Sequence, residues 1–249
     1  MKYLVVVLGS VGLIACGGGG GGGSAVSTPS STTIPVVSAL SFPLKAGLSA
    51  RTASGVAATL TAIGSVATRT TDGDCSGSIN RTTGPATAGT VFEGVAALSA
   101  VSVTSISFSN CTPTSSIETS TNYFDTNYVP RGLNIQGSDY GVYLVPPTIP
   151  SSVKVGDVGV VGTQTIYFNS SKNSIPPIKA TIVSSYIVEA DTATSAIVNL
   201  ITKRYHLGSS SSLLSTEQDR YRISSTGVLT AASVDIQYAS NSTLHLVFK

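Results

Sequence analysis

Residues 228–238 read VLTAASVDIQY, and the spacing of their apolar side chains decides the fold. Val234 and Ile236 fall at even positions, while Asp235 and Gln237 fall at odd ones. Side chains two positions apart lie on the same face of a β-strand. This stretch therefore predicts a strand with one apolar face and one solvated face.

The same alternation recurs through the second half of the chain. Its predicted strands are residues 158–168, 178–189, 194–206, 213–224, 228–238 and 244–248. Turn-forming residues such as Asn, Gly and Pro separate these runs, so the connections are short. Short connections indicate an antiparallel meander, whose apolar face must be covered by curling into a barrel or by packing on another layer.

The first half of the chain supplies further strands that can cover this face. They are predicted at residues 36–43, 56–70, 90–97 and 101–108, although the alanine-rich residues 55–62 also allow a helical turn. We therefore predict a mainly β fold with little helix, a half-barrel or β-sandwich, formed by one domain over residues 36–249. Within it, residues 36–130 form an N-terminal layer pinned by a disulfide, and residues 131–249 form the C-terminal meander.

The composition narrows the class of protein. Charged residues make up 10% of the 249-residue chain, where about 25% is typical. The net charge is +2 and the mean hydropathy is +0.30, yet beyond the first 16 residues no apolar run approaches the roughly 18 residues of a membrane helix. Because no basic run is present, we expect no nucleic-acid partner.

The start of the chain has the layout of an export signal. Lys2 precedes an apolar run from Tyr3 to Ile14, and the small Ala15 follows. This run falls short of the roughly 20 residues that a transmembrane helix needs. We therefore predict a cleaved signal peptide over residues 1–15.

Residues 13–16, Leu-Ile-Ala-Cys, resemble the lipobox of bacterial lipoproteins. The resemblance implies cleavage between Ala15 and Cys16 and attachment of lipid to the Cys16 thiol, which anchors the protein in a bacterial envelope membrane. Gly17 is not the Asp that marks inner-membrane retention in enteric lipoproteins, so the resemblance favours the outer membrane in a Gram-negative cell. Residues 16–35 are then the lipidated cysteine and a flexible Gly/Ser/Thr tether. The alternative is an ordinary signal peptide with a chance cysteine.

Cys75 and Cys111 remain as an even pair once Cys16 carries lipid. In the oxidising compartment that an export signal implies, such a pair predicts a disulfide. It would close a loop of about 35 residues and stabilise the domain by roughly 3–4 kcal/mol. Two free buried thiols are the alternative, and two cysteines with no nearby histidine do not make a metal site.

No stretch carries a recognisable catalytic or cofactor-binding motif. The two histidines, His206 and His245, stand at the end or on the polar face of predicted strands, where we expect solvated side chains. No G-x-S-x-G elbow accompanies them. Residues 72–74, Asp-Gly-Asp, read as a turn because a calcium loop needs further ligands and a closing glutamate. We therefore predict no catalytic residue, no metal site and no cofactor.

Aromatic residues gather between positions 123 and 140 and form the candidate patch for a ligand or partner. Its members are Tyr123, Phe124, Tyr128 and Tyr140, with Asp125 to add hydrogen bonds. A tyrosine offers a flat apolar face with a polar tip, which suits a glycan or an envelope protein as the partner. The alternative is that these rings plug the end of the sheet.

These features predict a membrane-anchored, non-enzymatic envelope lipoprotein with a binding or structural role. The alternative is a carrier that encloses an apolar ligand in its curled sheet, similar to periplasmic lipoprotein-sorting proteins. A secreted hydrolase ranks third, because histidines and acids are sparse. An apolar cavity on the order of several hundred Å³ inside the sheet would favour the carrier, whereas a filled core would favour the structural role.

Overall fold

A computed structural model of the chain describes residues 35–61, 76–109, 115–207, 212–239 and 245–249. The predicted signal peptide, Cys16, Cys75 and Cys111 lie outside these residues. The described part contains one helix, α1 (Leu44–Ser54), and no helix in it is long and apolar enough to cross a membrane. The strands are β1 (Val56–Thr61), β2 (Ser76–Thr83), β3 (Thr87–Phe92), β4 (Val95–Ser109), β5 (Ser115–Phe124), β6 (Pro130–Ile135), β7 (Asp139–Tyr143), β8 (Val158–Tyr167), β9 (Ile178–Ala190), β10 (Ser195–His206), β11 (Leu213–Ser224), β12 (Leu229–Tyr238) and β13 (His245–Phe248).

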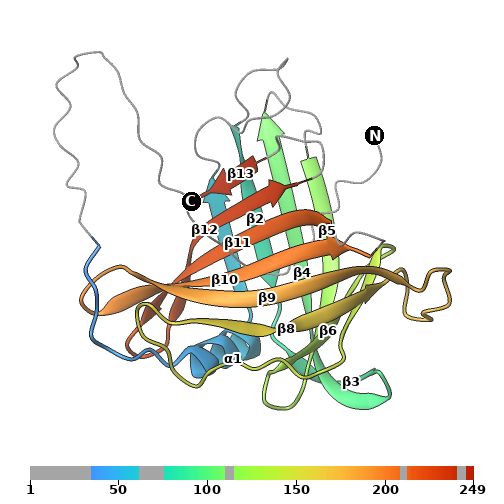
Figure 1. Ribbon diagram of the computed structural model, residues 1–249, viewed down its shortest axis with the longest axis horizontal. Coiled ribbons are helices and arrows are strands. Elements are labelled where there is room, and N and C mark those ends of the chain that lie inside the picture. Colours follow the sequence, from blue (N-terminus) through green and yellow to red (C-terminus); the bar gives the residue numbers. More distant parts are fainter. Residues whose placement is uncertain (1–34, 62–75, 110–114, 208–211, 240–244) are drawn as a thin grey trace.

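The strands form a single antiparallel sheet in which strands adjacent in sequence pair with each other, except that β2 pairs with β4 instead of β3 (Figure 1). The order across the sheet is β1-β2-β4-β5-β6-β7-β8-β9-β10-β11-β12-β13, and β3 pairs with β4 beside this path. The antiparallel meander predicted from the alternation of residues 228–238 is confirmed. It also continues through the N-terminal strands, so both halves of the chain belong to one sheet.

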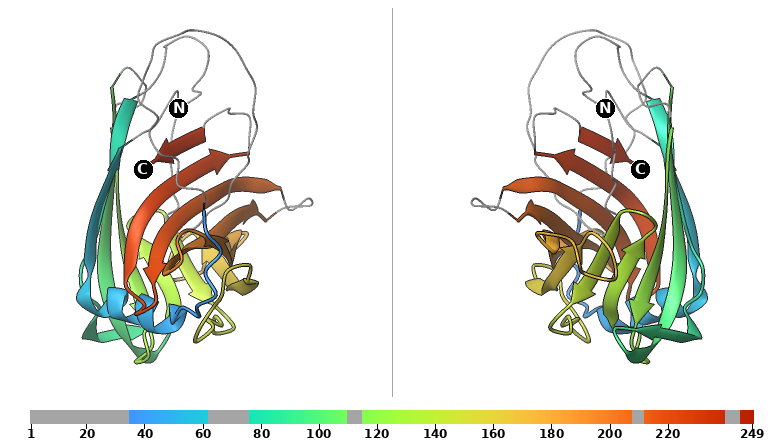
Figure 2. Two further views of the ribbon diagram at one scale, coloured as in Figure 1. Left: turned by 90° about the vertical axis from the view of Figure 1, so that its left-hand side faces the viewer. Right: turned by 90° about the vertical axis from the view of Figure 1, so that its right-hand side faces the viewer.

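The sheet curls until its first and last strands meet, which makes it a nearly closed barrel. The backbone amide of Thr61, at the end of β1, donates to the carbonyl of Lys249, and the amide of Lys249 donates back to Thr61, both at 2.9 Å. Figure 2 shows β2 and β4 in an upright layer that faces the curved layer of β10 to β13. A sheet curled in this way covers its own apolar face.

Apolar side chains from both layers fill the end of the barrel at which the sheet closes. Ile79 and Ile106, from β2 and β4, pack with Ile236, Leu246 and Phe248, from β12 and β13. Each of these side chains is at most 2% exposed. Ile236, Leu246 and Phe248 fall at the alternate apolar positions of their strands, which the sequence pattern predicts to be buried.

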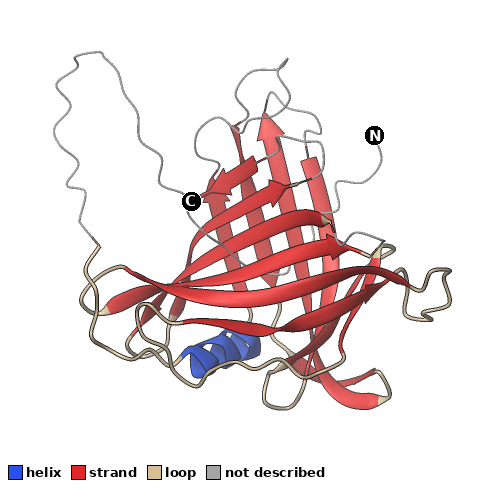
Figure 3. Cartoon of the chain, viewed as in Figure 1, coloured by secondary structure: helices blue, strands red, loops and turns tan. Residues whose placement is uncertain are grey.

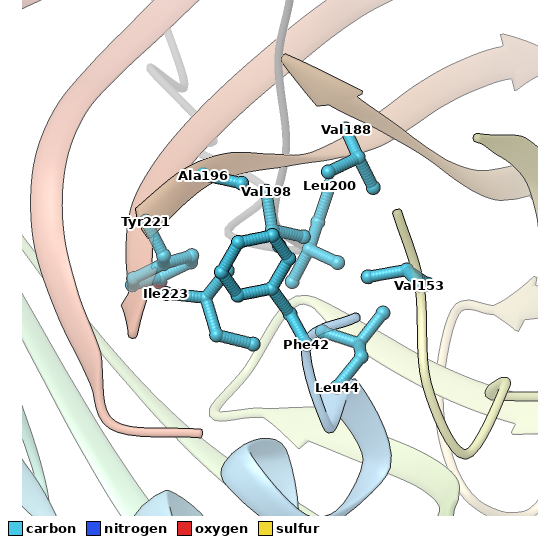
Figure 4. Packing of buried hydrophobic residues seen from close by; sticks show 9 residues of the cluster. All are labelled: Phe42, Leu44, Val153, Val188, Ala196, Val198, Leu200, Tyr221 and Ile223. Atoms are coloured by element: carbon cyan, nitrogen blue, oxygen red, sulfur yellow. The ribbon is translucent and has the colours of Figure 1, made fainter. Parts of the chain in front are cut away.

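The opposite end of the barrel is closed by α1 and the segment before it (Figure 3). Phe42 is completely buried and exchanges backbone hydrogen bonds with Val153, at 2.8 and 2.9 Å. Its ring lies among side chains of the sheet that include Val198 and Ile223 (Figure 4). Leu44, the first residue of α1, joins the same cluster and ties the helix to the sheet.

Helix α1 is the element that the sequence pattern does not indicate. Its segment, LKAGLSARTAS, contains only two leucines as large apolar residues, so the helical period is weak. Pro43 stands just before the helix, where the first amides have no partner within the helix. Gly55 ends it with φ of 70°, a left-handed conformation that favours glycine.

Candidate functional site

A cavity of about 250 Å³ lies inside the curled sheet, between α1 and the strands of both layers. Its lining includes Leu44, Leu200 and Tyr221, which belong to the apolar cluster around Phe42. A side pocket of about 20 Å³, the size of one water molecule, adjoins it at Arg51, Arg81, Asp219 and Tyr221. The cavity therefore lies beside the apolar cluster that α1 covers, and it is partly open to solvent.

One wall of the cavity is apolar. Leu44 and Leu48 lie four positions apart and so share a face of α1. Phe124, Ile149 and Leu200 complete this wall from the sheet and a loop. Such a surface can hold the hydrocarbon part of a ligand, because removing apolar area from water is favourable by roughly 25 cal/mol per Å².

A second wall is polar but already hydrogen-bonded. The register of β2 and β4 pairs Thr83 with Ser102, and their hydroxyl oxygens lie 2.8 Å apart. The Asn122 amide of β5 donates to Ser102 Oγ at 3.0 Å. Because these side chains hydrogen-bond to one another, they hold fixed polar groups at the cavity wall. Their hydrogen bonds do not depend on a ligand.

A buried ion cluster forms the charged end of the cavity. Arg81 Nη2 donates to Glu217 Oε1 at 2.9 Å, and Arg81 Nη1 donates to Asp219 Oδ2 at 2.5 Å. The Tyr221 hydroxyl also donates to Asp219 Oδ2, at 3.2 Å. Glu217 and Asp219 are only 3% and 1% exposed, so two carboxyl groups share one guanidinium away from water. Buried negative charge in excess of positive charge favours protonation of one carboxyl group.

Glu217 is the carboxyl group that holds this proton. Burial raises the pKa of Glu217 to about 8, while Arg81 opposes the shift and the Asp219 carboxylate adds to it. At pH 7 the Glu217 side chain is therefore mainly neutral. The positive charge of Arg81 then balances the negative charge of Asp219.

We expect the free energy of unfolding to fall by roughly 4 kcal/mol as the pH rises from 5 to 9. Glu217 has a higher pKa in the folded state than the ordinary 4.5, so the folded state binds this proton more tightly and loses that advantage as the pH passes through this range. Urea unfolding at several pH values measures the slope.

The matched variants for this pH test are Glu217→Gln and Glu93→Gln. The first should remove most of the slope, because the amide cannot titrate. The second should keep it, because bonds to Lys172 and Tyr140 outweigh burial and lower the pKa of Glu93 below 4.5. An unchanged slope in Glu217→Gln would contradict the assignment of the proton.

A second buried ion cluster joins β7 to β9 and β10. The Asp139 carboxylate accepts from Arg204 Nη1 at 2.7 Å and also from Lys179 Nζ. Burial opposes ionisation of Asp139, but the two cations outweigh it and lower its pKa. None of these three residues lines the cavity, so we assign this cluster to the stability of the sheet.

Arg51 brings a further positive charge to the cavity wall. It stands in the last turn of α1, and its guanidinium lies 4.6 Å from the centroid of the Tyr221 ring. This cation–π contact holds the charge against the sheet. Within the described part of the chain, no carboxylate lies within ion-pair distance of Arg51.

The structure divides the predicted aromatic patch into two groups, of which the first packs within the fold. Tyr123 stacks on Phe92 with 4.3 Å between ring centroids, and Tyr140 lies 5.4 Å from the same ring. The Tyr140 hydroxyl donates to Glu93 Oε1 at 2.7 Å, and Tyr140 is only 7% exposed. These two tyrosines serve the packing of β3 on β5 and β7.

The second group, Phe124 and Tyr128, lines the cavity. Asp125 holds the turn between them, because its Oδ1 accepts from the amides of Asn127 at 2.8 Å and Val129 at 2.9 Å. Tyr128 has φ of 60°, a left-handed conformation that costs a residue with a side chain on the order of 1–2 kcal/mol. Strain of this kind collects at ligand-binding positions.

We expect Tyr123→Ala to lower the free energy of unfolding by about 2–4 kcal/mol, because the ring stacked on Phe92 is lost. Tyr128→Gly should change it by no more than about 1 kcal/mol, because relief of the left-handed strain offsets the lost contacts. Urea unfolding of both variants measures the difference. Equal losses in the two variants would contradict this division of the aromatic residues.

Several residues at the cavity are not found by sequence motifs. Glu217 and Asp219 do carry a signal, because they fall at the same alternate positions as Tyr221 and Ile223 and therefore on the buried face of a predicted strand. Arg81 shows no such pattern. Its role depends on contacts with residues more than 130 positions away, which no local pattern reveals.

No protein-family model, no curated protein and no solved structure matches this chain. Among the residues that the structure describes, no three His, Cys, Asp or Glu side chains are grouped to hold a metal ion. The function must therefore be inferred from the cavity itself. Its apolar wall, bonded polar wall and charged end are features of a site for a small amphipathic molecule.

Proposed function

We propose that this chain is a non-enzymatic binding protein that holds a small amphipathic molecule in the cavity between α1 and the curled sheet. We also propose that lipid on Cys16 anchors it in the bacterial cell envelope, at the outer membrane. The cavity supports the first proposal. The resemblance of residues 13–16 to a lipobox supports the second.

The cavity between α1 and the curled sheet carries the binding proposal. Its space of about 250 Å³ is partly open to solvent, so its apolar wall faces water when no ligand is bound. A ligand that covers this wall removes apolar area from water, which is favourable by roughly 25 cal/mol per Å². The cavity therefore offers both the space and the driving force for binding a molecule with an apolar part.

The direct test is a titration with N-phenyl-1-naphthylamine, an uncharged dye whose fluorescence rises in apolar surroundings. The full chain with Cys16→Ser, which we expect in the soluble envelope fraction instead of the membrane, provides the protein. We expect saturable binding of one dye molecule per chain. Absence of saturable binding would contradict the binding proposal, and continued membrane partition of the Cys16→Ser chain would contradict the anchor.

Two tryptophan variants of the same helix locate the dye. Leu48→Trp places a large ring in the cavity and should weaken dye binding at least about tenfold, which is about 1.4 kcal/mol. Lys45→Trp adds the same ring on the exposed side of α1 and should leave binding unchanged. Equal binding by both variants would place the dye outside the cavity.

A further inference from the structure

We infer that the ligand of this cavity carries a carboxylate head group on a short apolar chain, and that the head group pairs with Arg51. This inference rests on the proposed binding function and names the class of ligand. It is drawn from the charges at one end of the cavity, the apolar wall and the size of the space.

The first argument is that Arg51 has no carboxylate partner among the residues that the structure describes. Arg81, Arg204 and Arg222 each donate to a carboxylate of the sheet. Arg51 lines the cavity, and within the described residues it has the Tyr221 ring but no carboxylate. A guanidinium presents its N–H groups as a planar fork that matches the two oxygens of a carboxylate. An acid in the cavity would supply the partner that the described part of the fold does not.

The second argument is the charge of the residues that line the cavity. Its charged lining residues are Arg51, Arg81 and Asp219, so two cations accompany one carboxylate, and Arg81 pairs with Asp219 at 2.5 Å. The lining therefore carries a net charge of about +1 beside an apolar space, where charges interact more strongly than in water. An anionic head group cancels this charge. A cationic head group would face both Arg51 and Arg81.

The third argument is the position of the apolar wall. Leu44 and Leu48 precede Arg51 on α1 by seven and three residues, so one helix supplies both the cation and part of the apolar surface. Residues at these spacings lie near one face of a helix. A molecule with its head at Arg51 can therefore extend its chain along the same helix toward Leu44.

The fourth argument is the size of the space. At roughly 30 Å³ for each water-sized group, a cavity of about 250 Å³ holds about eight such groups. This space suits a chain of about eight carbons. Octanoate is therefore the probe that fits both the volume and the charge.

The experiment is displacement of bound N-phenyl-1-naphthylamine from the Cys16→Ser chain at pH 7 by octanoate, octan-1-ol and octyltrimethylammonium. These three probes share one chain length and differ only in the head group. We expect octanoate to bind at least about tenfold more tightly than octan-1-ol, and the ammonium compound to bind most weakly.

Variants of Arg51 test whether this residue is responsible for the preference for a carboxylate head group. Arg51→Gln should remove the preference for octanoate, because it weakens binding of octanoate far more than binding of octan-1-ol. Arg51→Lys, which keeps the charge, should retain part of the preference. Arg222→Gln is the matched control, because Arg222 is exposed and paired with Asp191, and its binding should equal that of the parent chain.

The outcomes separate this inference from the binding proposal. If octanoate and octan-1-ol bind equally well, or if the preference survives in Arg51→Gln, the inference is wrong but the cavity still binds ligands. If neither the dye nor any of the three probes binds, the proposed function itself fails.

Discussion

Replacing Arg81 with methionine should lower the free energy of unfolding by about 3–5 kcal/mol at pH 7. Arg81 joins β2 to β11 across the interior through Glu217 and Asp219, at 2.9 and 2.5 Å. Methionine fills similar space but leaves the buried Asp219 carboxylate without its cation. Removing one member of a buried ion pair is costly because the other charge remains away from water. Urea unfolding followed by circular dichroism measures the loss.

Arg222→Met is the matched control for this prediction. Arg222 also bonds to a carboxylate, that of Asp191, but its side chain is 56% exposed. Exposed ion pairs contribute roughly 0–1 kcal/mol, so this variant should unfold almost as the parent chain does. A loss in Arg81→Met no greater than that in Arg222→Met would contradict the importance of the interior pair.

A triple variant separates lost packing from the buried charge. Adding Glu217→Gln and Asp219→Asn to Arg81→Met removes both carboxyl groups along with the guanidinium. Because no unpaired charge then remains, more than half of the lost stability should return. If the triple variant is as unstable as Arg81→Met alone, the loss must come from packing.

The antiparallel meander could be predicted from the sequence because its signal, the alternation of apolar and polar residues, is local. Alternate residues such as Val234 and Ile236 repeat every two positions, and the structure places both on the buried face. The closure of the barrel could not be predicted in this way. It depends on the pairing of Thr61 with Lys249, which are far apart in the chain and carry no shared pattern.

Helix α1 could not be predicted from the sequence, for a different physical reason. Its leucines pack against the sheet, but the rest of the helix is small or polar, so tertiary contacts decide its structure more than its own sequence does. The position of Arg51 at the cavity could not be predicted either, because Arg51 belongs to this helix. A single arginine carries no sequence signal for binding until the helix places it over Tyr221 at the cavity wall.

The aromatic residues were identified as a group but not by their separate roles. Tyr123 and Tyr140 meet on Phe92, which comes from a different hairpin, while Phe124 and Tyr128 reach the cavity. The sequence showed that aromatic residues gather in this segment. It could not show which of them pack on Phe92 and which line the cavity, because the position of Phe92 depends on how β3 folds back on β4.

Phe248→Ala should lower the free energy of unfolding by about 3–5 kcal/mol, because a fully buried ring is lost from a closely packed cluster. Phe248 is 0% exposed and lies among Ile79, Ile106 and Leu246 at the end where the sheet closes. The cluster joins β2 and β4 to β12 and β13, and Leu60 of β1 packs against it. Its weakening should therefore also loosen the pairing of Thr61 with Lys249, the residue after Phe248. Urea unfolding measures the stability, and amide hydrogen exchange at Thr61 reports the pairing.

Val247→Ala tests whether the inner face of β13 is what matters. Val247 is the immediate neighbour of Phe248 and is only partly buried, because alternate residues of a strand point to opposite faces. Its truncation should cost no more than about 1 kcal/mol and leave exchange at Thr61 unchanged. If Phe248→Ala unfolds no more easily than Val247→Ala, closure of the barrel does not depend on the buried cluster. The backbone hydrogen bonds between Thr61 and Lys249 would then be enough to hold the two edges of the sheet together.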